Sequence, residues 1–252
     1  MNFSEIFRDI FPLGVGTKHE GITWEYEQVR EYLISLSSGP QNLISINDYP
    51  QVIKLSRHWH EILDKMRRAS QDGLERLSFI GARDDKLTVQ EDFIIGEPHR
   101  IPSKLVSEAI RRGRRGTETE FIGTIHSHPR KRLERDILWG LWKERIHHVA
   151  GFSPKDLYPF TVSFSSYRFY PEYLAMVVEG NGVVLSLRTQ ETETAQINPE
   201  LVSQVAFDSY WRQKEKNDIH LNSDLEIAKR HNLVFYRANI GECLSRIPLT
   251  HN

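Results

Sequence analysis

The sequence contains one cysteine, Cys243, in a chain of 252 residues, and this scarcity excludes an intramolecular disulfide framework. A single cysteine also fits a reducing compartment, and the apolar context of Cys243 predicts a structural residue. The sequence also has no apolar run near the roughly 18 residues that a membrane-spanning helix needs. Its first residues include acids where a secretory signal would be basic and then apolar. These absences predict a cytoplasmic protein without a membrane segment.

An excess of charge of one sign is also missing, because the formal net charge is −1. Such a balance gives no general attraction to nucleic acid or to membrane surfaces. Hydrophobic residues make up 39% of the chain and charged residues 27%, which is ordinary for a globular protein. We find no internal repeat and no low-complexity segment. The length suggests one or two domains with a sizeable core.

Hydrophobic periodicity predicts a chain that contains both helices and strands. We divide it into an N-terminal helical extension (1–48), a central domain (49–197) and a small C-terminal α/β segment (198–252). The C-terminal segment either completes the core or forms an appendage. Expected helices cover 24–36, 52–69, 199–211 and 223–230; expected strands cover 43–46, 75–81, 87–95, 173–178, 183–187, 233–236 and 243–247.

The segment Gly-Thr-Ile-His-Ser-His-Pro, residues 123–129, contains the most informative residues of the chain. In a strand, side chains alternate between faces, so His126 and His128 project the same way. Pro129 cannot donate to a strand ladder, so the strand is expected to end just after His128. Two imidazoles at one strand end can share a metal ion, although an isolated His-x-His also occurs by chance.

A second segment, Ser153-Pro154-Lys155-Asp156, supplies a carboxylate and a hydroxyl. Asp156 would be the third ligand, and three protein ligands leave the fourth position of zinc open, as in catalytic sites. The same residues also suit a helix start, with Ser153 as the N-cap and Pro154 in the first turn. The two interpretations are compatible, because a helix N-terminus can present both groups.

Together these segments resemble the signature of the JAMM (MPN-type) metalloprotease family: an upstream Glu, His-x-His-Pro, then Ser-x-x-Asp. The resemblance covers roughly residues 50 to 190, including an apolar strand pair at 173–187. It implies an α/β fold of the cytidine-deaminase-like kind, with a mixed β-sheet flanked by helices, and a zinc ion bound by His126, His128 and Asp156.

The resemblance also implies roles for two further residues. Glu75 matches the family's general base, although the segment from Glu75 to Gly81 is one residue shorter than usual. A solvated Glu at a turn is the alternative for Glu75, and Glu118 and Glu120 are lower-ranked candidates for the base. Ser153 matches the residue that helps to stabilise the oxyanion.

Between the two halves of the motif, residues 130–152 form an insert that the family signature lacks. Leu138, Leu141, Trp142 and Ile146 would share one face of a helix. The insert is either a packed surface excursion or a wall that selects substrates. The arginines of 111–115 suit a helix C-terminus or a solvated loop, with an acidic partner as the alternative.

The family resemblance implies a zinc-dependent peptidase or isopeptidase that acts on a protein substrate, often a ubiquitin-like conjugate. Processing the C-terminus of a ubiquitin-like or sulfur-carrier protein is the alternative reaction. A non-catalytic scaffold of the same fold is a rival, but silent members are expected to lack ligands. A nucleobase deaminase would need the paired-cysteine signature, which is absent.

Overall fold

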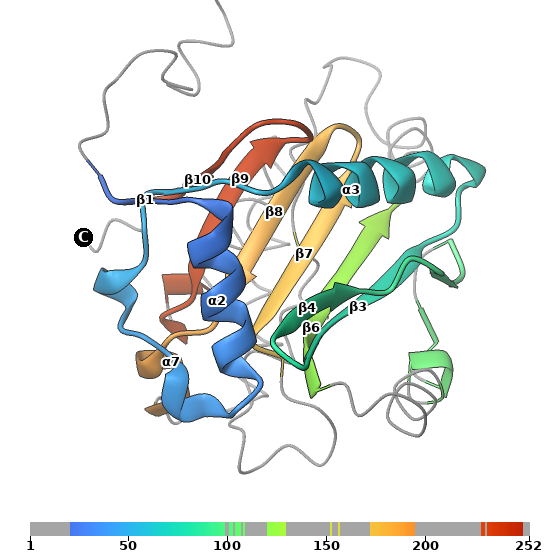
Figure 1. The fold of residues 1–252 in the computed structure, drawn as a ribbon. Coiled ribbons are helices and arrows are strands. Elements are labelled where there is room, and N and C mark those ends of the chain that lie inside the picture. The colour runs from blue at the N-terminus through green and yellow to red at the C-terminus, as the bar shows by residue number, and fades with distance from the viewer. Residues whose placement is uncertain are drawn as a thin grey trace, which may run out of the picture.

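In the computed structural model, the residues described are 21–98, 101–102, 104–106, 108, 120–129, 152, 156, 172–194, 228–229 and 231–248. Several expected features lie outside this set: the helix at 199–211, the helix at 223–230 apart from residues 228–229, the arginines of 111–115, and the insert at 130–152 apart from Phe152. The described part is mixed α/β, with one curled mixed sheet and few helices (Figure 1). No helix within it is long and apolar enough to cross a membrane.

The sheet runs in the order β1-β2-β10-β9-β8-β7-β6-β3-β4, and β5 also pairs with β3. Only the pairs β1–β2 and β6–β7 are parallel among the described strands, and the others are antiparallel. The strands are β1 (Thr23–Trp24), β2 (Val52–Ile53), β3 (Arg76–Arg83), β4 (Lys86–Val89), β5 (Ile94–Ile95), β6 (Glu120–His128), β7 (Leu174–Glu179), β8 (Gly182–Leu187), β9 (Val234–Asn239) and β10 (Leu244–Arg246).

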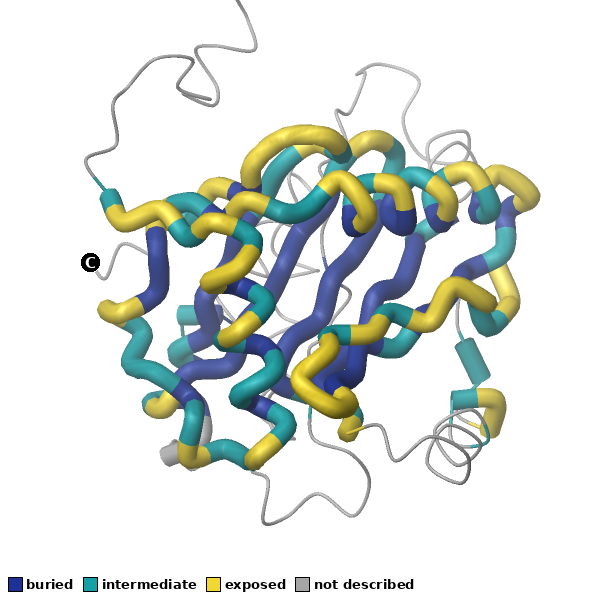
Figure 2. Tube along the Cα trace, in the orientation of Figure 1, coloured by how far each residue is buried: buried dark blue, intermediate teal, exposed yellow. Residues whose placement is uncertain are grey.

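Two helices cover one face of this sheet, α2 (Tyr26–Leu36) and α3 (Arg57–Ala69) (Figure 1). The backbone N–H of Glu25 donates to the Gln28 side chain at 3.0 Å, which caps α2. Ser56 caps α3 by accepting from the backbone N–H of Trp59 at 3.4 Å. Figure 2 shows the outcome: the central strands are buried along most of their length, while the outer sides of both helices are exposed.

The core has a part on each face of the sheet. The larger cluster joins the helices to the sheet through residues such as Leu33, Trp59, Met66, Ile80, Ile125 and Met176. A smaller cluster occupies the other face: Phe152, Ala175, Val177, Val184, Ala228, Leu233 and Phe235. His126 belongs to this second face, because it is in register with Val177 across the β6–β7 pair. The helices and the histidines are therefore on opposite sides of the sheet.

The termini of the described chain are part of the same sheet. β1 pairs with β2, and β2 also pairs with β10, so residues from both ends of the sequence meet at one side. α7 (Gln190–Thr194) follows β8, and short 3-10 turns lie at Pro40–Asn42, Ile46–Asp48 and Ser70–Asp72. The sheet thus runs through all three of the segments into which the sequence was divided.

The structure differs from the predictions in five places. The expected helices at 24–36 and 52–69 begin later, at Tyr26 and Arg57, because capping residues precede them and the two-residue strands β1 and β2 come first. The expected strand at 43–46 is wrong: this segment connects 3-10 turns. The expected strand at 87–95 divides into β4 and β5. Cys243, which was expected to be structural, is exposed and directly precedes β10.

Gly123 sets how closely β6 approaches β7. A Cβ atom at this position would lie 2.0 Å from the backbone carbonyl oxygen of Leu174, which no small shift of a side chain can relieve. Gly123 is in register with Leu174, three residues before His126. Because Gly123 has no side chain, β7 can pair closely with β6, the strand that carries the histidines.

We predict that Gly123→Ala lowers the free energy of unfolding by about 3 kcal/mol, because the strands must separate to accommodate the methyl group. Gly180→Ala is the control. Gly180 has φ of 58° and no atom within 4 Å of its added Cβ, so only the left-handed conformation is penalised, by about 1 kcal/mol. Denaturant unfolding of both variants measures the difference. Equal losses would show that the contact with Leu174 is unimportant.

Candidate metal centre

Strand β6 positions the first two residues of the site. Ile122 and Ile125 are fully buried and give the strand its apolar character, and the strand ends at His128, directly before Pro129. β6 lies between β3 and β7, so its backbone is paired on both sides. The His126 and His128 side chains project from the same face, and their ring centroids are 5.1 Å apart.

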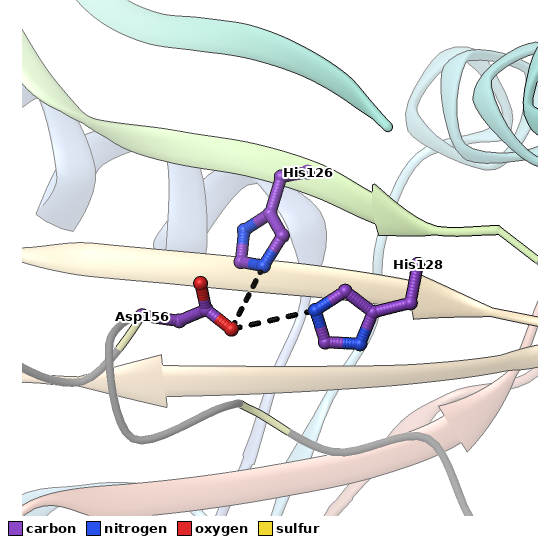
Figure 3. A group of neighbouring side chains, drawn as sticks. All are labelled: His126, His128 and Asp156. Atoms are coloured by element: carbon purple, nitrogen blue, oxygen red, sulfur yellow. Dashed lines mark ion pairs between the residues drawn. The ribbon is translucent and has the colours of Figure 1, made fainter. Parts of the chain in front are cut away.

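Asp156 completes the group from a different part of the chain. Its Oδ2 atom lies 3.3 Å from Nε2 of His126 and 3.3 Å from Nε2 of His128 (Figure 3). One ligand atom from each of the three residues lies within 4.8 Å of the others. The side chains are 9%, 10% and 22% exposed for His126, His128 and Asp156. This group could hold a metal ion.

The hydrogen-bonding needs of the group are not fully met by its own residues, and a cation would meet them. Nε2 of His126 is buried and has no hydrogen-bond partner among the described residues. Its distance of 3.3 Å to Asp156 is longer than the roughly 2.7–2.9 Å of a charge-assisted hydrogen bond. A buried nitrogen without a hydrogen bond is costly, and coordination of a metal ion would satisfy it.

The charges of the group reinforce each other. Burial alone would raise the pKa of Asp156, but attraction to the His126 and His128 imidazoles outweighs it and holds that pKa well below its usual range. For His128, burial acts to lower the pKa, but the nearby carboxylates of Asp156 and Glu179 outweigh burial and raise the pKa to about 10. In the metal-free protein, a proton therefore occupies the place that a metal ion would take.

His126 and His128 differ in their surroundings. His126 lies against Phe152, with ring centroids 6.4 Å apart, and Phe152 in turn packs on Phe235 at 5.6 Å. His128 lies at the end of the strand, where its Nδ1 is 3.5 Å from Oε2 of Glu179. Glu179 was not singled out from the sequence, where it lies within the strand pair expected at 173–187. Only the parallel register of β6 and β7 brings Glu179 next to His128, and no pattern in the sequence predicts that register.

A partly buried acid, Glu172, lies beside the group and was also missed. Thr124, two residues before His126 on the same face, donates from Oγ1 to Oε2 of Glu172 at 3.2 Å. Burial raises the pKa of Glu172 to about 8; Thr124 and Arg188 act against this rise, and the charge of Asp156 adds to it. Arg188 is fully buried and donates from Nε to the backbone carbonyl of Glu172 at 3.2 Å.

The structure separates the candidates for the general base. Glu75 is buried and immediately precedes β3, where its N–H donates to the carbonyl of Glu97 at 3.1 Å. The β3–β6 register pairs Arg76 with Ser127, so one further step aligns Glu75 with His128. Glu120 is exposed at the opposite end of β6, about 20 Å from His126 at the usual rise of a strand. Glu118 and Ser153 lie outside the described residues.

Comparison with known proteins adds no assignment. The sequence matches no protein-family model, no curated protein and no solved structure. The site is therefore interpreted from its own residues and geometry.

We predict that Asp156→Ala abolishes metal binding, because it removes the oxygen that both imidazoles face. Elemental analysis of the purified native chain should give about one metal ion per molecule, the occupancy of a single site with three protein ligands. Asp92→Ala, at an exposed position, is the control and should keep the metal. Full metal content in Asp156→Ala would remove Asp156 from the site.

We also predict that the native protein loses stability between pH 5 and pH 8 because of Glu172. Its pKa in the folded state, about 8, is above the ordinary 4.5. Its contribution to stability is therefore complete below pH 4.5 and is lost as the pH rises through 8. Glu172→Gln cannot ionise, so its unfolding midpoint relative to the native protein should rise from pH 5 to pH 8. Metal-free samples are used for both, and parallel pH dependences would contradict the assignment.

Proposed function

We propose that the protein is a zinc-dependent peptidase or isopeptidase that hydrolyses an amide bond and removes or processes a ubiquitin-like modifier. The observation that carries this proposal is the pair of 3.3 Å separations between Asp156 Oδ2 and the two histidine nitrogens. Two ligands each about 2.0–2.1 Å from zinc at the tetrahedral angle are separated by about 3.3 Å. The spacing supports zinc at a site with three protein ligands.

The resemblance to the JAMM family supports the choice of reaction. His-x-His-Pro at the end of a buried strand and an aspartate from a separate segment are the arrangement that the family's signature implies. We propose the family's cytidine-deaminase-like fold for the central part of the chain. The mixed sheet with helices on one face is compatible with that proposal.

In the proposed mechanism, His126, His128 and Asp156 hold the ion. When bound, zinc would polarise the substrate carbonyl as a Lewis acid and lower the pKa of a water molecule. Glu75 takes a proton from the attacking water on a carboxylate oxygen and returns it to the nitrogen of the leaving amine. The Ser153 hydroxyl donates a hydrogen bond to the carbonyl oxygen as it becomes negative.

Glu75 is preferred to Glu172 as the base because of its position along the sheet. Glu75 aligns with His128, at the end of β6 where the strand stops. Glu172 bonds to Thr124, on the other side of His126 from that strand end. We therefore assign the proton transfer to the acid that aligns with a metal ligand, His128, across the β3–β6 pair.

Glu75→Gln is predicted to keep zinc but to lose activity by about 10²–10⁴-fold, the usual contribution of a general base. The assay incubates the full chain with a panel of ubiquitin-like conjugates, with and without a chelator, and adds zinc back after chelation. Glu172→Gln is run in parallel and should lose far less activity. The opposite ranking of the two variants would assign the proton transfer to Glu172.

The same assay separates this proposal from its rivals. A non-catalytic scaffold would give no turnover with any conjugate, even when zinc is bound. A nucleobase deaminase of the same fold type would need paired cysteine ligands. The single cysteine, Cys243, lies beside β10, four strands from β6 in the sheet, which is about 19 Å at the usual strand spacing.

A further inference from the structure

Glu179 is the last residue of β7 and lies beside His128 on β6. The parallel register aligns the two residues, and Nδ1 of His128 is 3.5 Å from Oε2 of Glu179. Both side chains are largely buried, with 10% and 11% of their surface exposed. The contact therefore joins two neighbouring strands and lies on the side of the ring away from Asp156.

A neutral imidazole carries its proton on only one of its two nitrogens. A carboxylate beside Nδ1 accepts a hydrogen bond from an N–H there, so it favours the form in which Nε2 has a free lone pair. In His128, Nε2 is the nitrogen that lies 3.3 Å from Asp156. Glu179 thus selects the form of His128 that can bind a metal ion through Nε2.

His126 and His128 have different neighbours. The His126 ring is held in the interior against Phe152, which packs on Phe235. His128 is the final residue of its strand, and Pro129 follows it. Nδ1 of His128 is 3.5 Å from Oε2 of Glu179, so the contact with Glu179 holds this ring from the side opposite to Asp156.

The turn after β7 fixes where Glu179 points. Glu179 pairs with Gly182 across the β7–β8 hairpin, and Gly180 within the turn has φ of 58°. Because side chains alternate along a strand, a shift of one residue would direct Glu179 to the opposite face. The hairpin therefore holds the carboxylate on the face that carries the histidines.

We propose that Glu179 is a positioning residue of the metal centre, which keeps His128 in the Nδ1–H form and aims its Nε2 at the ion. This proposal rests on the metal centre of the proposed function, but it does not depend on the substrate or on the reaction. It predicts that changes at Glu179 weaken metal binding while the three ligands remain in place.

The test measures zinc affinity of the full chain by competition with a fluorescent chelator. Glu179→Gln keeps the size of the side chain and a neutral acceptor, whereas Glu179→Leu removes the acceptor. We expect zinc affinity to fall by about 10-fold in the first variant and by up to about 100-fold in the second. Glu120→Gln, at the exposed far end of β6, is the control and should bind zinc as the native chain does.

Two measurements distinguish positioning from general damage. The unfolding midpoint of metal-free Glu179→Gln shows whether the variant is folded. In the zinc-loaded native protein, NMR should show a His128 Nδ1–H signal protected from solvent exchange, and this protection should fall in Glu179→Gln. A folded variant with native zinc affinity and an equally protected signal would overturn the proposal.

The outcomes also separate this inference from the proposed function. If the native chain fails to bind zinc, the metal centre and the role of Glu179 are both wrong. If zinc binds normally and the Glu179 variants equal the native chain, only the positioning role is wrong. If the variants weaken zinc binding but no conjugate is cleaved by the native chain, the peptidase proposal fails and the role of Glu179 stands.

Discussion

The site depends on one shared atom, Oδ2 of Asp156, which lies at the same distance from His126 and His128. An acid held between two imidazoles in a low-dielectric interior is favourable only when a positive charge is also present. In the metal-free protein that charge is a proton, as the raised pKa of His128 shows. A divalent cation would replace the proton, so metal binding and proton release are coupled.

Two strand pairs give this arrangement its rigidity. β6 is paired on both sides, and Gly123 permits a close approach to β7 that any side chain would prevent. The helices cover the opposite face, so the histidine face is free of α2 and α3 (Figure 1). Functional groups placed on paired strands are held more precisely than groups on loops, because the ladder fixes their spacing.

The carboxylates around the histidines have different environments, and these environments suggest different tasks. Asp156 is kept ionised by the imidazoles, whereas burial favours the protonated form of Glu172. Glu179 contacts the far nitrogen of His128, and Glu75 aligns with the end of the same strand. Pairs of acids whose pKa values are driven apart are typical of active sites, although ion-pair networks in other places do the same.

The sequence by itself determined the strand that carries His126 and His128, because alternation and a terminal proline are local properties of the chain. It also predicted that the chain contains helices and strands, as the periodicity of each element is local, whereas the mixed sheet was implied by the family resemblance. Only the tertiary structure decided that Asp156 meets both rings, and that Glu172 and Glu179 lie next to them. Those contacts depend on which strands become neighbours and on their register. Hydrogen bonds between segments far apart in the sequence set the strand order and the register, and local preferences do not.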